Sequence, residues 1–252
     1  MPVRKLQQKR GWTFNVAVPI VKPTLLAVTD REWVDGEKIP ATGGCIVAFN
    51  HISHVDPLLS AHFLYDHGRL PRYLAKSGLF KNRFLGGFLR SAGQIPVERL
   101  SRNAVGAFDA AVEAVRAGEC VVVYPEGTLT RDPALWPMTG KSGAARIALE
   151  TGCPVIPVGQ WGAQELLPPY TAKPRLFPRT TIRMRAGDPV DLSDLLTAPR
   201  NTATINAATD RIMDAITGLV AGLRGEEPPA ERYDPRTSGV RQTGNPHKKE
   251  RP

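Results

Sequence analysis

Three short runs of apolar residues do most to limit the folds open to this chain. They are Cys45–Phe49, Cys120–Tyr124 and Pro154–Gly159, and they are apolar at nearly every position rather than at alternate positions. Such a run is typical of a strand buried on both faces of a sheet. Apolar residues at helical spacing lie between the runs, for example from Ser101 to Ala117. This alternation indicates an α/β layered domain with a largely parallel or mixed central sheet flanked by helices.

Further segments extend the same pattern. Strands are also expected at Gly93–Arg99 and Thr181–Arg185, and helices at 57–64 and 142–150. A final helix carries one apolar face, formed by Ile205, Ala208, Ile212, Ile216, Leu219 and Leu223. A length of 252 residues with 42% hydrophobic residues supports one domain with a substantial core, which we place at 31–224.

The two ends of the chain differ from this domain. Residues 1–30 form an arm that opens with four cations, Arg4, Lys5, Lys9 and Arg10. Its apolar run is broken by Pro19 and Pro23 well before the ~20 apolar residues that a spanning helix needs. The arm is consistent with an anchor at an anionic membrane surface and equally with simple packing onto the domain. Residues 225–252 lack an apolar face and are predicted to be disordered.

Charge and cysteine usage restrict the partners and the compartment. A net charge of +9 suits nucleic acid, an acidic membrane surface or a phosphorylated substrate. No nucleic-acid partner is expected, because aromatic residues are only 7% and no zinc-finger spacing or RNA-binding aromatic signature occurs. Cys45, Cys120 and Cys153 lie in or beside apolar runs, which favours reduced core thiols. No signal-peptide pattern is present, so we expect an intracellular domain.

A polar turn follows the first apolar run and contains His51 and Asp56. On a regular helix, residues five apart differ by roughly 140° and do not meet, so the two side chains can meet only through a turn. Pro57 suits the first helical position, which predicts Asp56 as the N-cap. The segment alone fits either a His–Asp dyad or a capped helix beside a loop histidine. If both functions coexist, one Asp56 oxygen caps the helix and the other holds His51.

Other strand ends also carry polar residues. Arg99 could hold a phosphate in a bidentate geometry or pair with a surface carboxylate. Pro125–Asp132 follows a buried strand, at the position where open α/β sheets place ligand sites, although a polar turn explains it as well. Gly140–Gly143 suggests a nucleotide-phosphate loop, but the earlier glycine of that motif would fall at Leu135, so we reject it.

Four segments in a fixed order carry a resemblance to a known family. They are Asn50–Asp56, Gly93–Arg99, Pro125–Thr128 and Val155–Val158. Together they closely resemble the glycerolipid acyltransferases, which include the 1-acylglycerol-3-phosphate acyltransferases. That family has a His-x4-Asp motif, a second motif that ends in arginine, a Glu-Gly-Thr motif and a later Ile-Pro-Val-like strand. The resemblance covers about residues 40–190 of this chain.

The resemblance implies a reaction. His51 would be the general base for the acceptor hydroxyl, and Asp56 would orient the imidazole. The hydroxyl would attack the thioester of acyl-CoA or acyl-carrier protein, and 1-acylglycerol 3-phosphate would become phosphatidic acid. No cofactor or metal is expected besides this co-substrate. No Gly-x-Ser-x-Gly elbow occurs, which agrees with direct transfer. The implied location is the cytoplasmic face of the cell membrane, as a peripheral or monotopic protein.

The resemblance also implies substrate-binding residues. Arg99 corresponds to the arginine expected to hold the acceptor phosphate, and Glu126, Gly127 and Thr128 correspond to the acceptor-binding motif. Many members have arginine directly after Glu-Gly-Thr, whereas this chain has Leu129 there and Arg131 two positions later. Arg131 is therefore an alternative phosphate contact. Lys141 resembles a later basic position and is a candidate for phosphate or acyl-donor contact.

Several other functions remain open on the sequence. The same chemistry could act on glycerol 3-phosphate, another lysophospholipid or a glycolipid. Water in place of the lipid hydroxyl would make the protein a hydrolase. His51, His54 and Asp56 have residue types that bind metals, but no further histidine or cysteine cluster completes a site. A non-catalytic membrane-binding module would also explain the arm and the charge.

Overall fold

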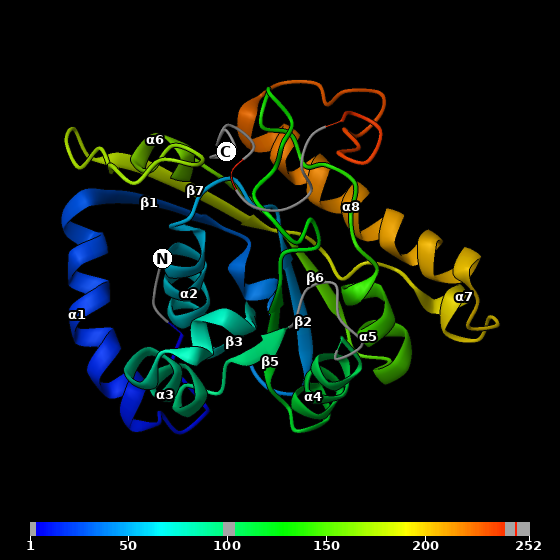
Figure 1. Cartoon of the computed structure of the whole chain (residues 1–252), viewed down its shortest axis with the longest axis horizontal. Helices are drawn as coiled ribbons and strands as arrows, with labels where there is room; N and C mark the ends of the chain where they lie inside the picture. The colour runs from blue at the N-terminus through cyan, green and yellow to red at the C-terminus, as the bar shows by residue number, and fades with distance from the viewer. Residues whose placement is uncertain (1–3, 98–103, 240–244, 246–252) are drawn as a thin grey trace, which may run out of the picture.

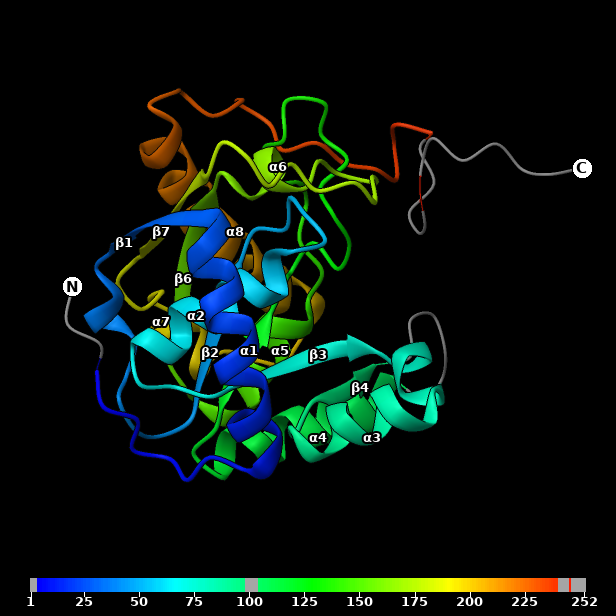
Figure 2. The same ribbon diagram turned by 90° about the vertical axis from the view of Figure 1, so that its left-hand side faces the viewer.

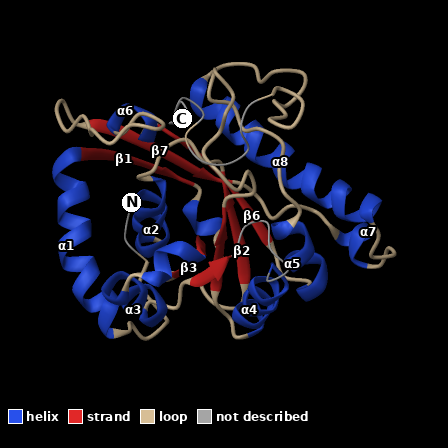
Figure 3. Cartoon of the chain, in the orientation of Figure 1, coloured by secondary structure: helices blue, strands red, loops and turns tan. Residues whose placement is uncertain are grey.

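One seven-stranded sheet organises the computed structural model, which describes residues 4–97, 104–239 and 245. The strands are β1 Thr29–Val34, β2 Cys45–Phe49, β3 Pro71–Lys76, β4 Ile95–Val97, β5 Cys120–Val123, β6 Val155–Trp161 and β7 Thr180–Ala186. Their order across the sheet is β1-β7-β6-β2-β5-β3-β4. Neighbours are parallel except β6 and β7, which are antiparallel. The predicted α/β class is confirmed, with a mixed sheet (Figure 3).

Helices cover both faces of this sheet (Figure 1). They are α1 Trp12–Val28, α2 Asp56–Asp66, α3 Arg83–Ser91, α4 Ala104–Arg116, α5 Gly143–Thr151, α6 Ala163–Leu166, α7 Ser193–Leu196 and α8 Thr202–Arg224. One core cluster joins the sheet to α4, α5 and α8, and a second joins it to α1 and α2. The predicted start of the 101–117 helix, and Glu98 and Arg99 at the end of the predicted 93–99 strand, lie outside the described residues.

The central strand β2 shows why its sequence is continuously apolar. Ile46 and Ala48 belong to the cluster with α4, α5 and α8, whereas Cys45, Val47 and Phe49 belong to the cluster with α1 and α2. Because successive side chains of a strand point to opposite faces, a strand covered on both sides requires apolar residues at every position. Cys45 and Cys120 are buried register partners on β2 and β5, and their thiols are free.

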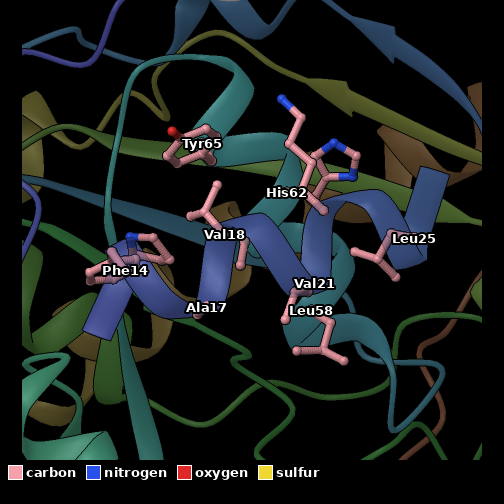
Figure 4. Close-up of a pocket in the computed structure, with 11 residues that line it drawn as sticks. Phe14, Ala17, Val18, Val21, Leu25, Leu58, His62 and Tyr65 are labelled. Carbon is pink, nitrogen blue, oxygen red and sulfur yellow. The ribbon is translucent and has the colours of Figure 1, made fainter. Parts of the chain in front are cut away.

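The N-terminal arm contains a helix that the sequence did not predict. The inner side of α1 contributes Phe14, Val18, Val21 and Leu25 to a small apolar pocket against α2 (Figure 4). The chain then continues into β1, also unpredicted, which pairs with β7 at the sheet edge. Within the described parts of the chain, no helix combines the length and the apolar character that crossing a membrane requires.

The start of the C-terminal tail packs on the domain. Arg232 pairs with Asp210 and Asp214 on α8. The carbonyl of Tyr233 accepts a hydrogen bond of 3.0 Å from the Thr139 amide. Arg232 and Tyr233, in the tail that composition predicted to be disordered, therefore contact α8 and the loop before α5.

Candidate active site

The turn between β2 and α2 brings His51 and Asp56 together. The Nδ1 atom of His51 lies 2.8 Å from Oδ2 of Asp56. The same oxygen accepts hydrogen bonds from the amides of Ile52 (2.7 Å) and Ser53 (2.8 Å). Asp56 is 0% exposed, so its carboxylate depends on these donors in place of water. Three donors on one oxygen fix both the turn and the imidazole.

The prediction that Asp56 also caps α2 is wrong. Its other oxygen, Oδ1, is buried without a hydrogen-bond partner among the described residues. The first amides of the helix, those of Leu58 and Leu59, donate instead to the carbonyl of Val55, and Asp56 is itself the first helical residue. The carboxylate faces back toward the preceding turn, because its donors lie there. Asp56 therefore orients the His51 ring and holds the amides of Ile52 and Ser53, and it does not cap the helix.

The imidazole ring of His51 is also held from its face. It stacks on Tyr124 with ring centroids 4.3 Å apart and planes 26° apart. The hydroxyl of Tyr124 lies 2.8 Å from Oγ of Ser60, and that of Tyr73 lies 2.7 Å from the same atom. With Nδ1 engaged by the carboxylate, that nitrogen carries the proton and Nε2 has the free lone pair. The side chain is 15% exposed, so a substrate can reach it.

A large apolar cavity opens beside this ring. Its volume is about 530 Å³, within the usual range for small-molecule sites. His51, Tyr73, Gln94 and Lys141 are among the polar residues of its wall. The apolar part of the wall comes from α1, α2, α3, the sheet and the short 3-10 helix Ser77–Lys81, and includes Phe14, Ala17, Leu58, Ala61, Leu74, Leu79, Phe88, Leu89, Val97 and Val123. The cavity suits a long apolar chain with its reactive end at His51.

Glu126 supports His51 from behind the cavity. Its Oε1 accepts from the amide of His51 (2.8 Å) and its Oε2 from the amide of Met138 (3.1 Å). The side chain is buried and is not part of the cavity wall. Burial raises the pKa of Glu126 to about 8, against the two amide hydrogen bonds, which lower it. In this structure Glu126 holds the main chain of His51, whereas the resemblance implied a contact with the acceptor.

Gly127 and Lys141 both line the cavity, and the absence of a side chain at Gly127 leaves room for the lysine. Gly127 has φ of 71°, a left-handed backbone that favours glycine. A Cβ atom there would lie 2.9 Å from Nζ of Lys141, so a side chain would displace the lysine. The amide of Lys141 donates to the carbonyl of Pro125 (2.8 Å), which places this cation beside the strand end that carries Tyr124. A positive charge and the imidazole thus share one cavity.

The remaining predicted residues lie elsewhere. Thr128 is half-buried and is not in the cavity wall. Arg131 is buried, with its guanidinium carbon 5.9 Å from the ring centroid of Tyr170, and it too is absent from the wall. Arg99 falls outside the described residues. His54 is exposed, and the described part of the chain has no group of three His, Cys, Asp or Glu residues that could hold a metal ion.

Sequence reasoning missed the aromatic and hydroxyl groups that surround His51. Tyr124 lies at the end of β5, a strand-end position that could have marked it as a site residue. Ser60 and Tyr73 give no such signal, since a serine inside a helix and a tyrosine in a strand are ordinary. Asn50 was read only as part of the motif, yet its side chain accepts from the Gln160 amide (2.8 Å) and joins β2 to β6.

Comparisons with known proteins add independent information. A family model described as Acyltransferase matches residues 31–161. The chain is 31% identical over 134 residues to a chloroplastic 1-acyl-sn-glycerol-3-phosphate acyltransferase of Brassica napus, across 52% of this chain and 37% of that protein. It is 28% identical over 184 residues to the 1-acyl-sn-glycerol-3-phosphate acyltransferase of Bacillus subtilis, across 71% of this chain and 84% of that protein.

A solved structure shows the same fold. The crystal structure of the 1-acyl-sn-glycerophosphate acyltransferase from Thermotoga maritima matches with a TM-score of 0.64 and 23% identity, over 86% of this chain and 81% of that one. At that identity the likeness concerns the arrangement of strands and helices. The geometry of the His51 turn rests on the contacts described above.

Proposed function

The chain belongs to the acyltransferase family, and on that premise we propose that it transfers a fatty acyl group from a thioester donor to the free hydroxyl of 1-acylglycerol 3-phosphate, giving phosphatidic acid. The observation that carries this proposal is the His51–Asp56 contact of 2.8 Å at the wall of an apolar cavity. A base, an orienting carboxylate and space for acyl chains are the parts that such a transfer needs.

The chemistry follows from the orientation of the imidazole. Nε2 of His51 removes the proton from the acceptor hydroxyl as its oxygen forms a bond to the thioester carbonyl carbon. The tetrahedral oxyanion then collapses, the carbon–sulfur bond breaks, and the leaving thiolate takes the proton back from the imidazolium. The carboxylate of Asp56 stabilises the imidazolium between these steps. General-base assistance of this kind typically contributes about 10²–10⁴-fold.

The cavity supports the choice of substrates. Its apolar wall provides burial for an acyl chain, and burial of apolar surface is the main source of affinity for such a ligand. Lys141 offers a cation for a phosphate of the acceptor or of the donor. Acyl-CoA and acyl-carrier protein both carry the required thioester, and the transfer needs no other cofactor.

A membrane location fits the exterior of α1. Its exposed residues, Trp12, Asn15, Val16, Pro19, Ile20, Pro23, Thr24 and Ala27, include no charged side chain. The cations Lys5, Lys9 and Arg10 precede this face. An uncharged helix face next to a basic segment is typical of binding to an anionic bilayer. We therefore propose that the protein binds the membrane surface, with α1 as its anchor.

An acceptor panel tests the proposed reaction. Purified protein is incubated with labelled acyl-CoA, or with acyl-carrier protein, and with 1-acylglycerol 3-phosphate, glycerol 3-phosphate, other lysophospholipids and a glycolipid. We expect phosphatidic acid as the main product. Transfer to a different acceptor would replace the substrate but keep the chemistry. Thioester cleavage at the same rate without any acceptor would refute the transferase function.

A further inference from the structure

A loop distant in sequence from the N-terminal arm combines exposed apolar residues with positive charge. Residues 171–179, between α6 and β7, are exposed throughout. Phe177 is 78% exposed, and Leu176 next to it is also exposed. Lys173, Arg175 and Arg179 belong to the same loop, which contains no aspartate or glutamate. A large exposed aromatic side chain within a purely basic segment is unusual for a surface that faces water alone.

Strand pairing fixes this loop beside α1. Thr29, directly after α1, is the register partner of Thr180, directly after the loop. Arg179 donates to the carbonyls of Leu26 (2.9 Å) and Thr29 (2.7 Å), and it pairs with Asp30 (2.8 Å). The loop therefore projects at the edge of the molecule where α1 ends (Figures 1 and 2).

We propose that loop 171–179 is a second contact with an anionic phospholipid bilayer. Leu176 and Phe177 enter the boundary between headgroups and acyl chains, while Lys173 and Arg175 pair with lipid phosphates. Apolar side chains give such contacts their depth and cations give them selectivity for anionic lipid. This inference rests on the membrane location proposed for α1 and adds a separate site to it.

A bilayer fits this edge better than an acidic protein partner. The exposed face of α1 next to the loop carries no charge along the whole helix. An acidic protein surface would leave its carboxylates desolvated against that face, at a cost that the loop cations offset only locally. A bilayer instead offers phosphates to the cations and hydrocarbon to the uncharged residues.

Two membrane contacts, α1 and loop 171–179, also fix the orientation of the domain on the bilayer. A domain held only by α1 could rotate about that helix, whereas a second contact beyond its C-terminal end sets the tilt of the molecule. Thr13, Phe14 and Ala17 of α1 are part of the cavity wall, so this tilt also sets how the cavity faces the lipid. The loop would thereby determine how a membrane-embedded acceptor reaches His51.

The apolar part of the contact is tested with the variant Leu176→Ser/Phe177→Ser in the full-length protein. The matched control is Leu196→Ser on α7, an exposed leucine (36%) that belongs to neither α1 nor the loop. Partition onto vesicles of phosphatidylcholine with phosphatidylglycerol is measured by co-sedimentation. We expect about a ten-fold loss or more for the loop variant, from the transfer of two apolar side chains, and no change for the control.

The charged part is tested with Lys173→Gln/Arg175→Gln. The control, Arg116→Gln/Arg211→Gln, removes the same charge from the exposed surfaces of α4 and α8. The loop variant should bind anionic vesicles about 25-fold more weakly, because each of the two cations contributes about five-fold at the membrane surface. The control should lose much less, and neutral vesicles should not distinguish the two variants.

Depth is measured directly with a polarity-sensitive dye on Phe177→Cys in a Cys153→Ser background, with Leu196→Cys as the reference position. The dye at 177 should shift to shorter wavelength on anionic vesicles and the dye at 196 should not. Unchanged vesicle partition in the serine and glutamine variants, or loss of binding only to an acidic carrier protein, would overturn the proposal. Vesicle results that depend on Phe177 would support it even if the acceptor panel gave no product.

Discussion

The two ends of α2 each bury an aspartate beside a histidine, but their surroundings differ. At the N-terminal end, Asp56 has amide donors and the His51 ring, without a cation in hydrogen-bond contact among the described residues. At the C-terminal end, Asp66 pairs with Lys22 (2.6 Å) and Arg31 (2.7 Å), and it accepts from Nε1 of Trp33 (3.2 Å). The second cluster fastens α1 and β1 to α2.

The histidines differ accordingly. His62 lies 3.4 Å from Asp66, yet its pKa is lowered to about 4: burial is the main cause, the carboxylate opposes it, and Arg31 and Lys22 add to the lowering. Burial alone would raise the pKa of Asp66, but the hydrogen bond from Lys22 and the nearby charges outweigh it and lower the pKa. A His–Asp contact is therefore not sufficient for general-base chemistry. The His51 ring, unlike that of His62, borders the large cavity, and its carboxylate partner contacts no cation among the described residues.

Replacing the two histidines should give the largest difference between the two ends of α2. His51→Gln is expected to lower kcat by about 10²–10⁴-fold, since the proposed base is lost. His62→Gln should change kcat by less than about three-fold, because that ring is not in the wall of the large cavity. Acyl transfer is measured on both proteins after circular dichroism has established folding. Equal losses in the two variants would exclude the assignment of His51 as the base.

The two aspartates should separate activity from stability. Asp56→Asn is expected to lower kcat by about 10²-fold or more, because the amide cannot stabilise the imidazolium as the carboxylate does. Asp66→Asn should leave kcat per folded molecule nearly unchanged but lower the free energy of unfolding by about 1–3 kcal/mol, since Lys22 and Arg31 lose their partner. Urea unfolding and kinetics on the same samples give both values. The opposite pattern would contradict the assigned functions.

Glu126, next to the His51 end of α2, should make the stability of the protein depend on pH. Its folded-state pKa of about 8 lies above the ordinary value of 4.5, so the folded protein holds a proton that the unfolded chain releases. This contribution to stability is complete below pH 4.5 and is lost as pH rises toward 8, by up to about 1.4 kcal/mol per pH unit. The free energy of unfolding, compared with that of Glu126→Gln from pH 5 to 9, should show this decline. A flat difference would mean that Glu126 is ionised in the folded protein.

Tyr124 should give the smallest effect. Tyr124→Phe keeps the ring against His51 and loses only the hydroxyl contact with Ser60, so kcat should fall by about two-fold or less. Tyr124→Leu removes the stacked face and should lower kcat by about ten-fold. A leucine variant as active as the phenylalanine variant would show that the carboxylate alone orients the base.

The buried half of the fold could be predicted from the sequence, because a strand covered on both faces leaves an uninterrupted apolar run. Strand β1 could not be predicted in this way, because Thr29–Val34 is an edge strand with three charged residues, Asp30, Arg31 and Glu32. Nor could α1, which continues through Pro19 and Pro23. Those prolines argue against an isolated helix, and packing against α2 and the Asp66 cluster outweighs them.

The candidate site also divides into features that the sequence could predict and features that it could not. The turn alone left a His–Asp dyad and a capped helix equally open, and the ordered set of four segments, through its resemblance to a known family, favoured the His51–Asp56 contact that the structure contains. The sequence could not show that Glu126 faces the main chain of residue 51, since that depends on how β5 and its loop lie beside β2. It also could not show which Asp56 oxygen is used.

The loop after β5 holds the main chain of His51 on both sides. The Glu126 side chain accepts from the His51 amide, and the Thr130 amide donates to the His51 carbonyl (2.7 Å). Because the second bond comes from the backbone, any residue except proline at position 130 could supply it. Positions 128 and 131 take no part in either bond. Side chains at these two positions can therefore change without loss of either bond, so the main chain of His51 is insulated from substitutions there.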